Sequence, residues 1–259
     1  MIADLHNHTL LCNHATGTID QYIKKAIEKE TAYFGFSDHA PMNFDQNYRM
    51  RFDQMKMYEA DILSAKIKYE GKIEILLGYE VDFLPGYIDQ RVLDAKVDYL
   101  IGSVHFIDGW GFDNPEFIGN YKNKDIDKIW QEYFDAIKMM AKSQLFNIVG
   151  HIDLIKVFNF LPKKDIRIIA KEALDAIKKA DMAVEINMAG LRKPVKELYP
   201  SQKLLQQIRE LDIPICFGSD AHKPEDISLF AKEAKNLAKS TGYEKCAIFK
   251  DKQRDMINF

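Results

Sequence analysis

Residues 2–8 read Ile2-Ala3-Asp4-Leu5-His6-Asn7-His8, a short apolar run that ends in two histidines. Ile2–Leu5 has the character of a β-strand, and the two-residue spacing of the histidines puts both imidazoles on the same side of the chain. Other apolar runs with strand character follow along the sequence. They are Tyr33–Ser37, Ile73–Asp82, Val97–Phe106, Asn147–His151, Ala183–Asn187 and Ile213–Ser219, with a weaker eighth at Cys246–Lys250.

Segments of helical period separate these runs. They are Thr18–Glu30, Asp53–Glu70, Tyr87–Ala95, Asp125–Lys142, Asp165–Lys179, Ser201–Leu211 and Pro224–Ser240. Alternation of this kind is typical of parallel βαβ units, and the strong strands predict a closed α/β barrel. No repeat or linker interrupts the pattern, so we expect one domain over residues 1–259. Two irregular stretches, Ala40–Arg51 and Ile107–Lys124, are long enough to predict functional loops.

Composition narrows the classes of partner. The 36 basic and 39 acidic residues leave a formal charge of -3, which excludes a global field that would attract nucleic acid or anionic lipid. The three cysteines are odd in number and widely spaced, which favours reduced thiols in the cytoplasm over a disulfide framework. No stretch approaches the ~20 apolar residues of a membrane span. We therefore expect a cytoplasmic protein that acts on a small molecule, with its oligomeric state left open.

Residues of metal-binding type fall where the predicted strands end. The candidates are His6, His8, His39, Glu80, His105, His151, Asp220 and His222, with His14 in a loop. A single His-x-His or Ser-Asp-His is weak evidence, because such residues also occur on half-exposed strands and as helix caps. Strand ends of a parallel barrel meet on one face, however, so several agreeing positions predict one cluster.

Glu80 strengthens this interpretation, because it lies in the buried-looking strand Ile75–Val81, where an unpaired carboxylate is costly unless a cation compensates it. The nitrogen and oxygen donors suit Zn²⁺, Mn²⁺ or Fe²⁺, and they are too many for one ion. Two to three divalent ions would make a positive pocket that selects an anionic substrate and can hydrolyse a phosphoester.

The motifs also resemble a known family, the polymerase-and-histidinol-phosphatase (PHP) superfamily, and most of all its histidinol-phosphatase branch. The resemblance rests on Asp4-Leu5-His6-Asn7-His8-Thr9, Gly35-Phe36-Ser37-Asp38-His39-Ala40-Pro41, Gly78-Tyr79-Glu80, Ser103-Val104-His105-Phe106, Gly150-His151-Ile152-Asp153, Ile186-Asn187, Gly190-Leu191-Arg192 and Ser219-Asp220-Ala221-His222. It implies a distorted, TIM-barrel-like (β/α)7 barrel with a trinuclear centre.

The resemblance further implies three groups of ligands. His6, His8, Glu80 and Asp220 would hold the first ion, and Glu80 would bridge to a second ion held with His105 and His151. His14, His39 and His222 would hold the third. A two-metal version stays open, because His14 lacks a distinctive flanking motif.

Other residues must bind the substrate. Arg192 and Lys193 follow the sixth strand, which supplies no metal ligand, so its loop is free to present cations to a phosphoryl group. Arg192 is the preferred phosphate clamp, with Arg49, Arg51 and Lys156 as second choices. Asp108 and Trp110 belong to a loop of carboxylates and aromatics that could receive an ammonium and an imidazole ring. The alternative interpretation is that these are solvated charges and a packed surface loop.

The implied activity is hydrolysis of L-histidinol phosphate to L-histidinol and phosphate by a metal-bound hydroxide. Glu80 would bridge the metals, Asp220 would act as ligand and proton acceptor, and Arg192 would stabilise the developing charge. Alternatives are a PHP-type nuclease, a general small-molecule phosphatase, an amidohydrolase-type enzyme and a non-catalytic metal module. A nuclease should show a basic, aromatic-lined groove, and an amidohydrolase a bridging lysine at a strand end, and the sequence shows neither.

Overall fold

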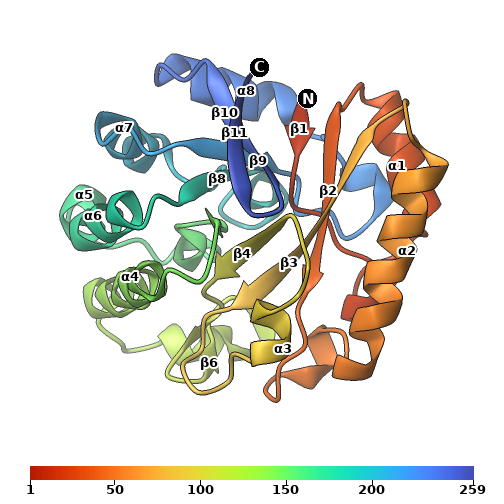
Figure 1. Cartoon of the computed structure of the whole chain (residues 1–259). Helices are drawn as coiled ribbons and strands as arrows, with labels where there is room; N and C mark the ends of the chain where they lie inside the picture. Colours follow the sequence, from red (N-terminus) through yellow and green to blue (C-terminus); the bar gives the residue numbers. More distant parts are fainter.

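The computed structural model describes all residues 1–259 and contains a parallel sheet with the strand order β1-β2-β3-β4-β7-β8-β9 (Figure 1). The strands are β1 Ala3–Asp4, β2 Tyr33–His39, β3 Glu74–Asp82, β4 Tyr99–Ser103, β7 Ile148–Val149, β8 Ala183–Asn187 and β9 Ile215–Gly218. A hydrogen bond from Leu5 N to Phe217 O (2.8 Å) connects the first strand to the last and closes the ring. The predicted seven-stranded α/β barrel is confirmed.

Helices surround the sheet, as Figure 1 shows. They are α1 Ile19–Glu28, α2 Met55–Lys68, α3 Gln90–Leu93, α4 Ile126–Ser143, α5 Ile166–Ile169, α6 Lys171–Lys179, α7 Gln202–Glu210 and α8 Ala231–Ser240. α4 illustrates why they dock: Ile129, Tyr133 and Ile137 recur every four residues on one side, and all three are buried. None of the helices combines the length and apolar character needed to cross a membrane.

Two predicted helices differ from the structure. The segment Asp165–Lys179 is divided into α5 and α6 around Ala170. The segment Pro224–Ser240 starts with a short 3₁₀ turn over Pro224–Asp226, and α8 begins only at Ala231. Ser228 between them has a φ of 54°, a left-handed conformation that a continuous α-helix does not allow.

The weaker eighth strand is a strand, but it does not join the barrel. β10 (Lys245–Lys250) pairs antiparallel with β11 (Gln253–Asn258) as a hairpin. Ala247 and Phe249 of this hairpin share one apolar cluster with Tyr99, Ile148 and Ala183, which lie at the amino ends of barrel strands. The hairpin therefore covers the amino-terminal mouth, and the carboxyl-terminal mouth is left for the site.

The long stretch Ile107–Lys124 contains structure of its own. β5 (Phe106–Ile107) and β6 (Trp110–Gly111) form a two-stranded hairpin, and a 3₁₀ helix follows over Pro115–Tyr121. The loop leaves the carboxyl end of β4, so it stands at the mouth of the barrel.

Candidate metal centre

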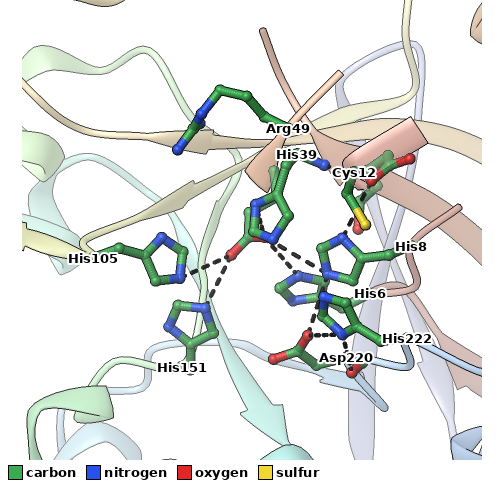
Figure 2. A network of polar contacts seen from close by, with 12 residues as sticks. His6, His8, Cys12, His39, Arg49, His105, His151, Asp220 and His222 are labelled. Atoms are coloured by element: carbon green, nitrogen blue, oxygen red, sulfur yellow. Dashed lines mark hydrogen bonds and ion pairs between the residues drawn. The ribbon is translucent and has the colours of Figure 1, made fainter. Parts of the chain in front are cut away.

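Side chains from the carboxyl ends of the strands converge on one region (Figure 2). The structure brings together all the sequence-predicted ligands: His6, His8, His14, His39, Glu80, His105, His151, Asp220 and His222. Three groups of their donor atoms each lie within 4.8 Å of one another: His6 with His8 and Glu80, Glu80 with His105 and His151, and His14 with His39 and His222. The second and third groups contain the residues of the ligand sets implied by the resemblance. The first contains three of the four residues of its set, and the fourth, Asp220, has its Oδ1 3.2 Å from His8 Nε2.

Glu80 lies between the first two groups. Its Oε1 is 2.9 Å from His151 Nε2, and its Oε2 is 3.3 Å from His6 Nε2 and 3.0 Å from His39 Nδ1. The carboxylate is 1% exposed. Burial raises its pKa, but the facing histidines outweigh this and hold the pKa well below its usual range. One oxygen thus faces each group, which is the arrangement that a bridging carboxylate needs.

The group of His14, His39 and His222 favours neutral imidazoles. Burial lowers the pKa of all three, that of His39 to about 4. A neutral ring keeps a lone pair on one nitrogen, which is the form that binds a metal.

Buried nitrogen and oxygen atoms without hydrogen-bond partners show whether these residues suit divalent cations. His6 Nε2, Glu80 Oε2 and His222 Nε2 are buried and accept or donate no hydrogen bond. Buried polar atoms without partners are rare and destabilising, and here they point into one cluster. A cation would satisfy them together, so the residues present fit bound divalent metal ions.

Carboxylates behind the histidines set their orientation. Glu185 Oε1 is 2.7 Å from His6 Nδ1, Asp38 Oδ1 is 3.4 Å from His8 Nδ1, and Asp82 accepts from His105 Nδ1. A carboxylate at Nδ1 keeps the proton there and leaves Nε2 with its lone pair toward the centre.

Sequence reasoning missed these three carboxylates. Glu185 lies in the apolar strand Ala183–Asn187, where the burial argument applied to Glu80 would have found it. Asp38 adjoins His39, and Asp82 lies two residues after Glu80 and therefore on the same face of β3.

The backbone leaves little space around Glu185. A Cβ at Gly218 would overlap Glu185 Oε1 and lie 2.6 Å from His6 Cβ. Two residues later, Asp220 has a φ of 50°, and its Oδ1 lies 3.2 Å from His8 Nε2. Strained backbone of this kind is common at functional sites.

A cavity of about 610 Å³ opens above the cluster, and Arg192, Lys193 and Arg49 line it. Arg192 Nη2 donates to the carbonyls of Ser219 (2.9 Å) and Asp220 (2.8 Å), while its Nη1 is buried without a partner. Two hydrogen bonds thus hold the guanidinium in place, and its Nη1 is left without a partner.

The other cations are engaged differently. Arg49 is buried and donates to Asp82 (2.8 Å), so it serves an ion pair at the cavity wall. Arg51 is exposed and pairs with Asp53, and Lys156 is buried against Glu197 (2.8 Å). Neither Arg51 nor Lys156 lines the cavity.

Asp108 and Trp110 do not reach this cavity. Both line a second depression with Lys124, whose Nζ lies 4.4 Å from the centre of the Trp110 ring. The hairpin turns these two side chains away from the metal cluster and presents later residues of the loop instead.

One further donor was left out of the predicted set. Cys12 Sγ lies within 4.8 Å of donor atoms of His8 and His222. The thiol is buried, which raises its pKa, and it donates to Thr9 O (3.2 Å). The metal group therefore has a sulfur neighbour that the sequence pattern did not suggest.

Comparisons with known proteins show what this chain is similar to. The family model described as PHP domain matches residues 4–189. A Deinococcus radiodurans protein named "Probable histidinol-phosphatase" is 37% identical and covers 91% of this chain and 92% of its own length. The histidinol-phosphatase of Bacillus subtilis is 29% identical, with coverages of 89% and 97%.

A solved structure has the same fold. It is a histidinol phosphate phosphatase from Lactococcus lactis complexed with zinc, L-histidinol and phosphate. It superimposes with a TM-score of 0.81 at 23% identity and covers 98% of each chain. The family match ends at residue 189, so Asp220 and His222 lie outside the matched range. Their place in the cluster is known from the structure.

Proposed function

Because the chain belongs to the PHP domain family, we propose that it is a metal-dependent histidinol-phosphatase, which hydrolyses L-histidinol phosphate to L-histidinol and inorganic phosphate. The observation that carries the chemistry is the buried Glu80 carboxylate, which faces one group of histidines with each oxygen. The names of relatives that match about the full length of the chain support the choice of substrate.

We assign the ligands in three groups: His6, His8, Glu80 and Asp220 for one ion, Glu80, His105 and His151 for a second, and His14, His39 and His222 for a third. The donors are imidazole nitrogens and carboxylate oxygens, which suit zinc, manganese or iron. When bound, such ions act as Lewis acids that lower the pKa of water and neutralise phosphate charge.

Arg192 binds the phosphoryl group in this proposal. Its guanidinium is fixed by the carbonyls of Ser219 and Asp220, so the unpaired Nη1 is already oriented and loses little entropy when it meets an anion. Lys193, which is exposed at the rim of the cavity, adds positive charge. Both cations become more effective as negative charge builds up on the phosphoryl oxygens.

Asp220 moves the proton. Its Oδ1 lies 3.2 Å from His8 Nε2, and its Oδ2 accepts from Asn187 Nδ2 (3.2 Å). The carboxylate is therefore held at the cluster and faces the cavity, where it can accept a proton from the attacking water. Asp220 is thus assigned two roles in this proposal, metal ligand and proton acceptor.

The setting of the reaction is also part of the proposal. The cavity of about 610 Å³ has the size of a small-molecule site, so we infer a small phosphate monoester as the partner.

Three free, buried cysteines support a reducing compartment, the cytoplasm. We treat residues 1–259 as one functional domain, because the ligands span from β1 to the segment after β9.

Steady-state hydrolysis by protein of measured metal content tests this function. We expect L-histidinol phosphate to be preferred over p-nitrophenyl phosphate and over single-stranded DNA. The Glu80→Gln variant should lose metal and turnover together, whereas Glu74→Gln, an exposed change on the same strand, should retain both. Preference for DNA, or full metal content and activity in Glu80→Gln, would overturn the assignment.

A further inference from the structure

The loop after β6 presents one carboxylate to the catalytic cavity. Asp113 lies two residues after Gly111, at the start of the segment that continues into the 3₁₀ helix Pro115–Tyr121. It lines the cavity of about 610 Å³ together with Phe106, Asn114 and Phe117. The side chain is partly buried, so water does not fully solvate it.

Asp113 differs from every other acidic residue that lines this cavity, because it has no partner. Glu80 and Asp220 face histidines, Asp82 and Asp45 pair with Arg49, and Asp226 pairs with Arg192. Asp113 forms no ion pair and no hydrogen bond to another residue, and the nearby Lys193 does not pair with it. A carboxylate without a partner in a partly desolvated place is unfavourable unless a ligand supplies the cation.

The charges around Asp113 place it near the second ligand group. Burial raises the pKa of its carboxyl, and the charges of His105, Lys193 and His151 act in the opposite direction. Asp113 therefore lines the same cavity as His105 and His151 of the second ligand group and is close enough to be influenced by their charge.

We propose that Asp113 is the binding site for the ammonium group of the substrate, and that it selects phosphate monoesters that carry an amine close to the ester. This inference rests on the proposed function. In L-histidinol phosphate the ammonium is bonded to the carbon next to the one that bears the phosphate, so an ester bound at the metal cluster holds its ammonium close by. The hydrogen bonds would be charge-assisted on both sides.

The rest of the wall fits the remainder of this molecule. Phe106 and Phe117 line the cavity on the same loop as Asp113, and Phe117 is 45% exposed. A planar imidazole lying against these rings would cover apolar surface that water otherwise contacts. The site then binds phosphate at the metals, ammonium at Asp113 and the ring along the phenylalanines.

Selectivity follows from the unpaired charge. An analogue without the amine brings the same negative phosphate near Asp113 but supplies no cation to pair with it, and buried polar groups left unpaired are a strong source of discrimination between similar substrates. The enzyme should therefore discriminate against neutral-chain phosphates through Asp113 and not through the metals.

The test compares L-histidinol phosphate with 3-(imidazol-4-yl)propyl phosphate, which has the same carbon chain and ester and lacks only the amine. Asp113→Asn keeps the shape of the side chain and removes its charge. We expect kcat/KM for L-histidinol phosphate to fall about 10- to 100-fold, the effect of losing a hydrogen bond between charged groups, with the analogue changed less than about threefold. Asp108→Asn, on the same loop but outside the cavity, is the matched control and should leave both substrates unchanged.

Metal content and thermal unfolding of Asp113→Asn are measured beside the rates and should equal those of the wild type. Equal losses on both substrates, or no loss on either, would overturn the role of Asp113 while wild-type turnover of L-histidinol phosphate still supports the proposed function. A wild type that hydrolyses the analogue but not L-histidinol phosphate would overturn the proposed function, and this inference with it.

Discussion

Glu185 provides the sharpest test of how the centre is built. Its Oε1 accepts a hydrogen bond from His6 Nδ1 (2.7 Å), and its Oε2 accepts from the backbone N–H of His151 (2.9 Å) and from Asn187 Nδ2 (3.0 Å). One buried carboxylate thus orients residues of two different ligand groups. We expect Glu185→Gln, which hardly changes the volume, to weaken metal binding.

The reason is a change of tautomer. Gln has a single acceptor oxygen, so it can satisfy either His6 or the two donors from His151 and Asn187. Keeping the two donors is favoured, and the amide NH₂ then faces His6 Nδ1, which must accept instead of donate. The proton of His6 moves to Nε2, the atom that faces Glu80, and the ring stops being a ligand.

The expected loss follows from the role of such partners. Removing a hydrogen-bond partner of a metal-bound histidine weakens metal affinity about 10- to 100-fold. This corresponds to about 1.4–2.8 kcal/mol of binding free energy. The whole effect should appear at the His6 group, because the carboxylates behind His8 and His105 are unchanged.

Competitive zinc titration against a chromophoric chelator measures the affinity, and ¹⁵N NMR of the imidazoles reports the tautomer. Glu74→Gln is the control, because Glu74 is exposed and pairs with Lys250 on the outside of the barrel. Wild-type zinc affinity in Glu185→Gln, or an unchanged His6 tautomer with weakened binding, would refute this reasoning.

Four further predictions follow from the same structure. Gly218→Ala should lower stability by about 1–3 kcal/mol, because its Cβ overlaps Glu185, and thermal unfolding together with metal analysis checks it. Arg192→Lys should raise KM for the phosphate substrate, because Lys lacks the planar fork in which Nη2 holds both carbonyls while a second nitrogen, Nη1, is left for phosphate, and steady-state kinetics checks it. Chelation of the metals should lower Tm, because Glu80 loses its compensating cations, and added zinc should restore it. Burial raises the pKa of Cys246 from 9.0 to about 12, so its thiol should resist iodoacetamide at pH 9 until urea unfolds the chain, and mass spectrometry checks this. The contribution of this thiol to the free energy of unfolding should be complete below pH 9 and lost as the pH rises toward 12.

Much of the fold could be predicted because periodicity reports burial directly. The strand Ala183–Asn187 and the helix near Asp125–Lys142 appear within a residue or two of the expected bounds. Where tertiary contacts decide, the sequence left the outcome open. Cys246–Lys250 has strand propensity, but only its packing under the barrel shows that it pairs with β11 and not with the ring.

By itself, the sequence determined which residues form the cluster. A parallel barrel brings all carboxyl strand ends to one mouth, so His6, Glu80, His151 and Asp220 must meet there whatever the details of packing. Only the tertiary structure decided which side chains orient the metal ligands and which are available to bind the substrate. Glu185 reaches His6 across 179 positions, Arg192 keeps one N–H free, and Asp113 faces the cavity where Asp108 faces away. These roles depend on side-chain directions and loop paths, which are set by packing between distant residues and leave no periodic signal in the chain.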